Sequence, residues 1–168
     1  QYDEIYLTSN GETGLSKAFK PIIAMAQQKH IPISVLCATQ HSVVSGLKRV
    51  EISVNNFTKS CALEAIKRAR LMGIPVIASV VDDGTVDINC ENISSELSVE
   101  GVLVRSLQQE GLSEKNAGQS RFYLQKDYDE KFIGIFPVVA YRELEQFGTP
   151  VDCINHFGEK VQYLGAAA

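Results

Sequence analysis

Three polar loops contain most of the side chains that could do chemistry in this chain. The first loop, residues 9–14, reads Ser-Asn-Gly-Glu-Thr-Gly and follows an apolar run directly. Its backbone N–H groups, and the helix start that comes after them, could hold a phosphate group. Its spacing is neither that of a Walker loop nor that of the dinucleotide-binding fingerprint, so a tight turn explains the glycines equally well. The candidate ligand-binding residues of this loop are Ser9, Asn10, Gly11 and Gly14.

The second loop follows another apolar run and contains Gln40 and His41, both candidate ligand-binding residues. A cysteine thiolate beside an imidazole is the basis of nucleophilic catalysis by cysteine, and Cys37 lies just before this loop. Because Cys37 falls within the apolar run, inert packing is the favoured interpretation of its thiol. His41 therefore remains a binding candidate rather than a catalytic one.

The third loop brings together Asp82, Asp83 and Asp87, and carboxylates at the end of a strand can hold a divalent cation. Their spacing does not match a calcium-binding loop, and Asp83-Gly84 is a strong signal for a hairpin turn. Asp82 and Asp83 are kept as ligand-binding candidates. We predict no metal site, no catalytic residue and no cofactor.

Repeated strand-helix-strand units are expected to position these loops. Within residues 4–38, an apolar run, a glycine-bearing turn, a helical stretch and a second apolar run follow one another, as in parallel strands joined by a crossover helix. The junction from helix to strand at Ile31-Pro32 recurs at Ile74-Pro75, where proline ends the helix. The sequence thus predicts a Rossmann-like α/β fold, a three-layer parallel sheet, over residues 1–111. In open sheets of this class, ligands bind outside the carboxyl ends of the strands.

The pattern changes after the last predicted helix, residues 98–110, whose apolar residues recur at helical spacing. Residues 112–165 contain short β-type runs separated by turns, and consecutive strands without helices between them pair antiparallel. We expect a small antiparallel β-rich part there. Residues 166–168 are three alanines that look like a linker, and we expect the chain to be a piece of a larger polypeptide.

Composition narrows the classes of partner. The formal net charge of −4 argues against a dedicated nucleic-acid binder, because contact with phosphates needs clustered Lys and Arg. One such cluster exists, and its residues Lys67, Arg68 and Arg70 are the candidates for nucleic-acid contact. No apolar run is long enough to span a bilayer, and the four widely spaced cysteines favour free thiols. We therefore expect a cytoplasmic domain without membrane contact.

Residues 4–12 and 35–46, with a helix between them, resemble the middle of a RecA-like helicase domain. In that family one strand ends in Asp-Glu, which binds magnesium and activates water, and the next strand leads to a Gln that senses the terminal phosphate. Here Gln40 matches the sensor, whereas Thr8 and Ser9 stand in place of the two acids, and no Walker lysine loop is present. The resemblance implies a degenerate, ATP-inactive domain of the kind found in conjugative relaxase-helicases.

These observations lead to two hypotheses of different classes. The first is a non-catalytic binding or positioning domain of a larger intracellular protein, helicase-like and in contact with single-stranded DNA or a protein partner. The alternative is an enzyme or small-molecule binder that recognises a phosphorylated ligand at the carboxyl ends of the parallel strands.

Overall fold

The computed structural model describes residues 4–8, 12–55, 59–82, 88–106, 121–124, 154 and 159–160. Along the described chain, the four connections between the first five strands carry two 3₁₀ turns and three α-helices, and a sixth strand comes last. The elements are β1 (Ile5–Leu7), η1 (Thr13–Leu15), α1 (Phe19–Gln28), β2 (Ile33–Cys37), η2 (Gln40–Ser42), β3 (Arg49–Ser53), α2 (Lys59–Leu71), β4 (Val76–Asp82), α3 (Cys90–Leu97), β5 (Gly101–Ser106) and β6 (Arg121–Leu124).

The strands form one sheet in the order β1-β2-β3-β4-β5-β6. The first five strands are parallel, with Ile5 opposite Ile33, Val35 opposite Val50 and Ile77 opposite Gly101. β6 pairs antiparallel with β5. The predicted parallel α/β sheet is therefore confirmed.

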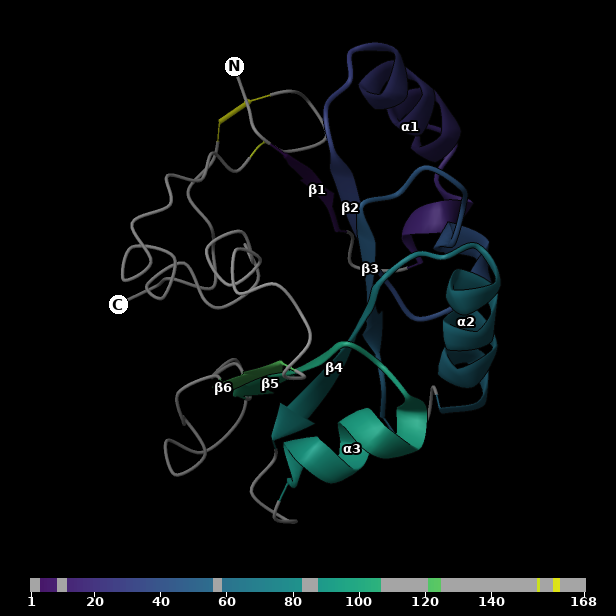
Figure 1. Cartoon of the computed structure of the whole chain (residues 1–168). Coiled ribbons are helices and arrows are strands. Elements are labelled where there is room, and N and C mark those ends of the chain that lie inside the picture. Colours follow the sequence, from purple (N-terminus) through teal and green to yellow (C-terminus); the bar gives the residue numbers. More distant parts are fainter. Residues whose placement is uncertain are drawn as a thin grey trace.

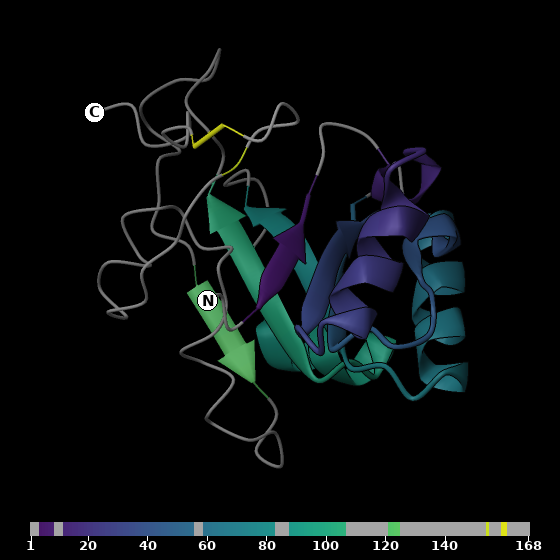
Figure 2. The same cartoon turned by 90° about the horizontal axis from the view of Figure 1, so that it is seen from above.

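All three α-helices lie on the same face of the sheet (Figure 1), and the view from above shows the same arrangement (Figure 2). The physical reason is the hand of the connections. Crossovers between parallel strands are right-handed, so strands added always in one direction send each connection over the same face. The described residues thus show two of the three predicted layers, and their strand order lacks the reversal that creates the ligand crevice of doubly wound folds.

The predicted helix over residues 98–110 is wrong. The helix lies earlier, in α3, where the Asn89 side chain accepts a hydrogen bond from the Asn92 N–H and so caps the first turn. α3 ends at Leu97, its C-cap residue Ser98 has a left-handed φ of 48°, and the chain then enters β5. The apolar residues from Val99 onward match a buried strand as well as a helix, because successive residues of β5, Val102, Leu103 and Val104, are all buried.

Of the predicted β-rich part, the structure describes β6 and one antiparallel bridge between Ile154 and Lys160. β6 belongs to the same sheet as β1 to β5. The remaining residues of 112–165, and the whole of 166–168, lie outside the described residues. No described helix is both long enough and apolar enough to cross a membrane.

The hydrophobic core lies between the sheet and its helices. Alternate residues of the strands point towards the helices, as the two-residue period of a strand requires. The strand residues of this core are Ile33, Val35, Cys37, Val50, Ile52, Val76, Ala78, Val102 and Val104, and the helix residues are Phe19, Ile23, Ala26, Ala62, Ala65, Ile66 and Ala69. All of them are buried.

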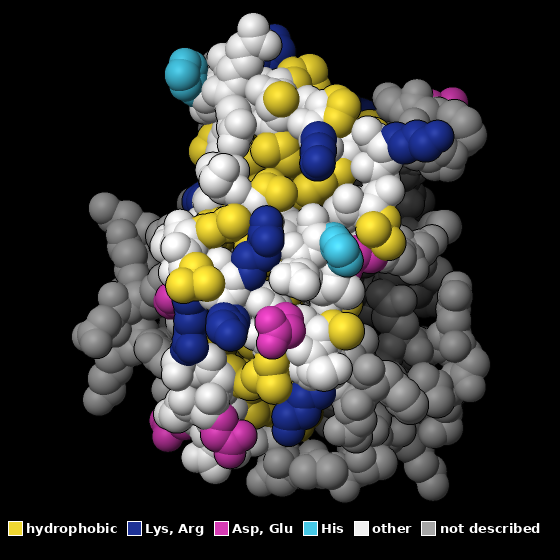
Figure 3. All heavy atoms as spheres, turned by 90° about the vertical axis from the view of Figure 1, so that its right-hand side faces the viewer, with side chains coloured by type: hydrophobic (Ala, Val, Ile, Leu, Met, Phe, Trp, Pro, Cys, Tyr) yellow, Lys and Arg dark blue, Asp and Glu magenta, His cyan; other side chains and the backbone are white. Residues whose placement is uncertain are grey.

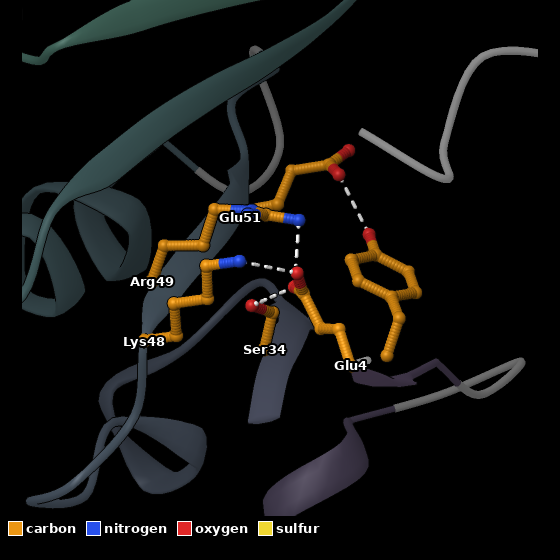
Figure 4. A network of polar contacts seen from close by, with 6 residues as sticks. Glu4, Ser34, Lys48, Arg49 and Glu51 are labelled. Carbon is orange, nitrogen blue, oxygen red and sulfur yellow. Dashed lines mark hydrogen bonds and ion pairs between the residues drawn. The ribbon is translucent and has the colours of Figure 1, made fainter. Parts of the chain in front are cut away.

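The alternate residues of β1 to β3, on the face away from the helices, form a buried polar network (Figure 4). The Glu4 carboxylate, just before β1, accepts hydrogen bonds from Ser34 Oγ at 2.6 Å and from Arg49 Nη2 at 2.7 Å. Its second oxygen pairs with Lys48 Nζ at 2.7 Å. In the same network Tyr6 donates to Glu51 at 2.6 Å.

This polar network fixes the position of β1, a strand of three residues at the edge of the sheet. The side chains of Arg49 and Glu4 are 1% and 7% exposed, so their charges are compensated inside the protein. A shift of β1 by one residue would turn the Glu4 carboxylate towards the apolar helix face and leave the buried Arg49 charge without it, and both changes are costly. The network therefore favours a single register of β1 against β2.

We predict that Glu4→Gln lowers the free energy of unfolding by about 3–5 kcal/mol, because it leaves the buried Arg49 charge without its carboxylate. Lys48→Gln is the matched control. Its side chain is 22% exposed, and its loss should cost under about 1 kcal/mol. Urea unfolding of the two variants measures the difference, and equal costs would contradict the role assigned to the network.

Candidate functional site

The two 3₁₀ turns that follow β1 and β2 pack against each other at the carboxyl edge of the sheet. The Gly14 N–H donates to Ser42 Oγ at 2.6 Å, and Thr13 Oγ1 donates to the Leu36 carbonyl at 2.9 Å. A Cβ at position 14 would lie 2.5 Å from the backbone carbonyl of His41, so only glycine allows this approach. Gly14, predicted as a ligand-binding residue, thus has a packing role in the contact between η1 and η2.

The carboxylate of Glu12 lies at the centre of this contact. Its Oε2 accepts hydrogen bonds from the backbone N–H groups of Ala38 at 3.0 Å and Thr39 at 3.1 Å. Its Oε1 accepts from the hydroxyl of Ser42. The sequence predicted phosphate donors in the backbone of residues 9–14, whereas here Glu12 of that loop accepts hydrogen bonds from backbone N–H groups at the end of β2.

Gln40 and His41 lie in η2, which the Thr39 side chain caps by accepting from the His41 N–H at 3.3 Å. Both residues are exposed. They line a pocket of about 250 Å³ whose other wall is the first part of α2, and the lining residues are Thr39, Gln40, His41, Ser60, Cys61 and Glu64. The sequence placed Gln40 and His41 in one loop correctly but gave no sign that α2 faces them.

The thiol that shares a pocket with His41 is that of Cys61, whereas Cys37 is buried in the core. Burial and the negative charges of Glu12 and Glu51 raise the pKa of the Cys37 thiol, so it stays protonated at neutral pH. This agrees with the interpretation of Cys37 as a packing residue. No local sequence pattern joins Cys61 to His41, because the two residues belong to different elements.

The remaining loop candidates are only partly described. Asp82 is the last residue of β4, and its side chain is not described. Ser9, Asn10, Gly11 and Asp83 lie outside the described residues. Within the part of the chain that the structure describes, no group of three or more His, Cys, Asp and Glu side chains could hold a metal ion.

The predicted basic cluster lies on α2, and all three of its side chains are exposed. Two of them also hold the fold together. Arg68 Nε donates to the Val43 carbonyl at 2.7 Å, and Arg70 Nη2 donates to the carbonyls of Leu97 at 2.9 Å and Ser98 at 2.5 Å. Arg70 thereby satisfies carbonyl groups at the end of α3. The third member of the cluster, Lys67, is exposed on the same helix.

Comparison of the chain with protein-family models, with curated proteins and with solved structures gave no match in any of the three. The resemblance to a RecA-like helicase domain therefore stays a prediction from the sequence.

We predict that iodoacetamide labels Cys61 in the native protein and leaves Cys37 unlabelled, because alkylation needs an accessible thiolate. Cys61 is exposed, whereas Cys37 is 3% exposed. Site-resolved mass spectrometry before and after unfolding in urea measures both reactions. Native labelling of Cys37 at the rate of Cys61 would contradict the packing of β2 against the helices.

Proposed function

We propose that this chain is a non-catalytic binding and positioning domain of a larger protein. The observation that carries the proposal is that the Glu12 carboxylate accepts hydrogen bonds from the N–H groups of Ala38 and Thr39 and from the hydroxyl of Ser42. The edge of the sheet at which a parallel α/β protein commonly binds its ligand is thus ordered by the chain's own side chain. A domain with a self-ordered edge can present its outer surface to a partner without first binding a nucleotide.

The surface that we propose as the binding site for a partner is the solvent-exposed face of α2. Leu63, Lys67 and Leu71, here called the α2 stripe, follow each other at intervals of four residues and so lie on one side of the helix. Leu71 is 82% exposed and Leu63 44%. Figure 3 shows this side of the molecule, where apolar and basic side chains are interspersed.

Charge indicates the chemistry of the partner. α2 contains Lys59, Lys67, Arg68 and Arg70 against the single acid Glu64, whereas the whole chain has a net charge of −4. Apolar side chains flanked by basic ones are complementary to an amphipathic helix with acidic residues beside its apolar face. We therefore propose that the partner is a protein segment of this kind.

Single-stranded DNA is the second candidate partner, because Lys67, Arg68 and Arg70 could contact its phosphates. Proteins that bind single strands also stack the bases on aromatic side chains. Among the described residues, the large exposed apolar side chains are Leu, Met, Val and Ile. This composition favours the protein partner over the nucleic acid.

The helicase-like identity is part of the same proposal and rests on the sequence resemblance. Thr8 cannot coordinate magnesium as a carboxylate would, and Gln40, the residue that matches the sensor, is exposed on η2. Both features are compatible with a domain that has lost ATP hydrolysis. The alternative, a binder of phosphorylated ligands, draws its support from the pocket beside Gln40 and His41.

A peptide titration followed by amide NMR tests the proposal. The probe is a helical 18-residue peptide of Leu and Glu with one apolar face, and a peptide of equal composition in scrambled order is the control. We predict that the first peptide shifts the amide resonances of the α2 stripe, and that Leu71→Ala with Lys67→Glu weakens binding at least about tenfold, or about 1.4 kcal/mol.

Leu15→Ala is the matched control variant, since Leu15 is 69% exposed on η1 rather than on α2. It should bind the peptide as well as the wild type does. A (dT)₁₂ oligonucleotide forms the second arm of the titration. Shifts of α2 with the oligonucleotide and not with the peptide would replace the protein partner by single-stranded DNA, and shifts with neither would contradict the docking role of α2.

A further inference from the structure

Three donors converge on the two oxygens of one carboxylate at the end of β2. The N–H groups of Ala38 and Thr39 lie 3.0 Å and 3.1 Å from Glu12 Oε2, and the Ser42 hydroxyl donates to Oε1. Successive backbone N–H groups that point to one spot form an anion-binding concavity. The three donors bind only the carboxylate oxygens of Glu12, so another oxyanion of similar size could accept the same hydrogen bonds.

Three contacts around the donors do not involve Glu12. The Gly14 N–H bonds to Ser42 Oγ, and the Thr39 side chain caps η2 through the His41 N–H. The guanidinium of Arg68 ties the end of the same turn to α2 through the Val43 carbonyl. These three contacts position η2 and Ser42 without involving the Glu12 carboxylate.

The cradle and the neighbouring pocket meet at Thr39. Its backbone N–H binds Glu12, and the same residue lines the pocket of about 250 Å³ together with Gln40 and His41. Of the residues that form the cradle, Thr39 is the one that lines the pocket, so the pocket adjoins the cradle at this residue. The pocket wall across from η2 adds the hydroxyl of Ser60 and the thiol of Cys61.

We propose that the turn after β2 is an oxyanion-binding site, that the Glu12 carboxylate is its resident occupant, and that a carboxylate or phosphoryl group of a small ligand takes its place when Glu12 withdraws. Ala38, Thr39 and Ser42 bind the oxyanion, and the pocket beside Thr39 receives the rest of the ligand. This site is separate from the α2 stripe.

Thermal unfolding of Glu12→Ala tests the proposal by chemical rescue. Loss of the carboxylate leaves three donors without their acceptor and should lower the Tm by about 4–8 °C. Formate or inorganic phosphate at about a hundred times its Kd should raise the Tm of the variant by about 5–10 °C. The wild type should shift much less, because Glu12 already fills the site.

Sodium chloride at matched ionic strength is the control for general salt effects, and Glu12→Ala combined with Ser42→Ala is the control variant, which should lose most of the rescue. The formate and phosphate arms show which oxyanion the cradle prefers. In amide NMR, the rescuing anion should shift the resonances of Ala38 and Thr39.

A folded Glu12→Ala variant that neither formate nor phosphate stabilises beyond chloride would overturn the proposal. If Glu12→Ala does not fold, refolding on addition of formate or phosphate supports the site. Failure of that rescue, with no shift of the Ala38 and Thr39 resonances when phosphate is added to Glu12→Gln, overturns it. Because none of these readouts involves the α2 stripe, failure here leaves the docking proposal to its own test.

Discussion

Strand order is the constraint on which the other features of this domain depend. The five parallel strands follow one another across the sheet in sequence order, and right-handed crossovers then place every helix on one face. The apolar core forms on that face, between the strands and α1, α2 and α3 (Figure 1). On the opposite face, the charged residues Arg49 and Glu51 of β3 are buried, and they bind Glu4 and Tyr6 respectively.

The same strand order shapes the functional edge. A doubly wound sheet opens its ligand crevice where the strand order reverses and two neighbouring connections leave towards opposite faces. The described strands have no such reversal. Instead, η1 and η2 pack together on the helix side, and a single carboxylate, Glu12, satisfies the donors at the end of β2. A domain built this way has its ordered edge without a ligand, and two of its large exposed apolar side chains, Leu63 and Leu71, lie on the outer face of α2. Both features favour a role in positioning a partner.

The sequence predicted the features that depend on neighbouring residues. The apolar runs, the Ile-Pro junctions and the glycine stop after α2 locate β1 to β4, α1 and α2, because each signal lies within or beside the element that it defines. The region from 98 to 110 failed because buried strands and buried helices have similar composition, so spacing alone misassigned it. The cap at Asn89 was the local signal that would have placed α3 correctly.

The site was predictable only in part, for a different reason. Gln40 and His41 could be located because a polar loop after a buried strand marks the sheet edge. Glu12 could not be recognised, since its partners Ala38 and Ser42 are 26 and 30 residues away along the chain. The same holds for Glu4, which reaches Lys48 across 44 residues. Such contacts exist only once the strands have paired, so no window of sequence contains them.

Amide hydrogen exchange at the end of β2 tests most directly the central claim that Glu12 orders this edge in place of a ligand. In the wild type, the account predicts slow exchange of the Ala38 and Thr39 amides although both lie beyond the last residue of β2. In Glu12→Gln these two amides should exchange at least about tenfold faster, whereas the Val35 amide inside the strand keeps its rate. Equal exchange of Ala38 and Thr39 in the two proteins would contradict the account.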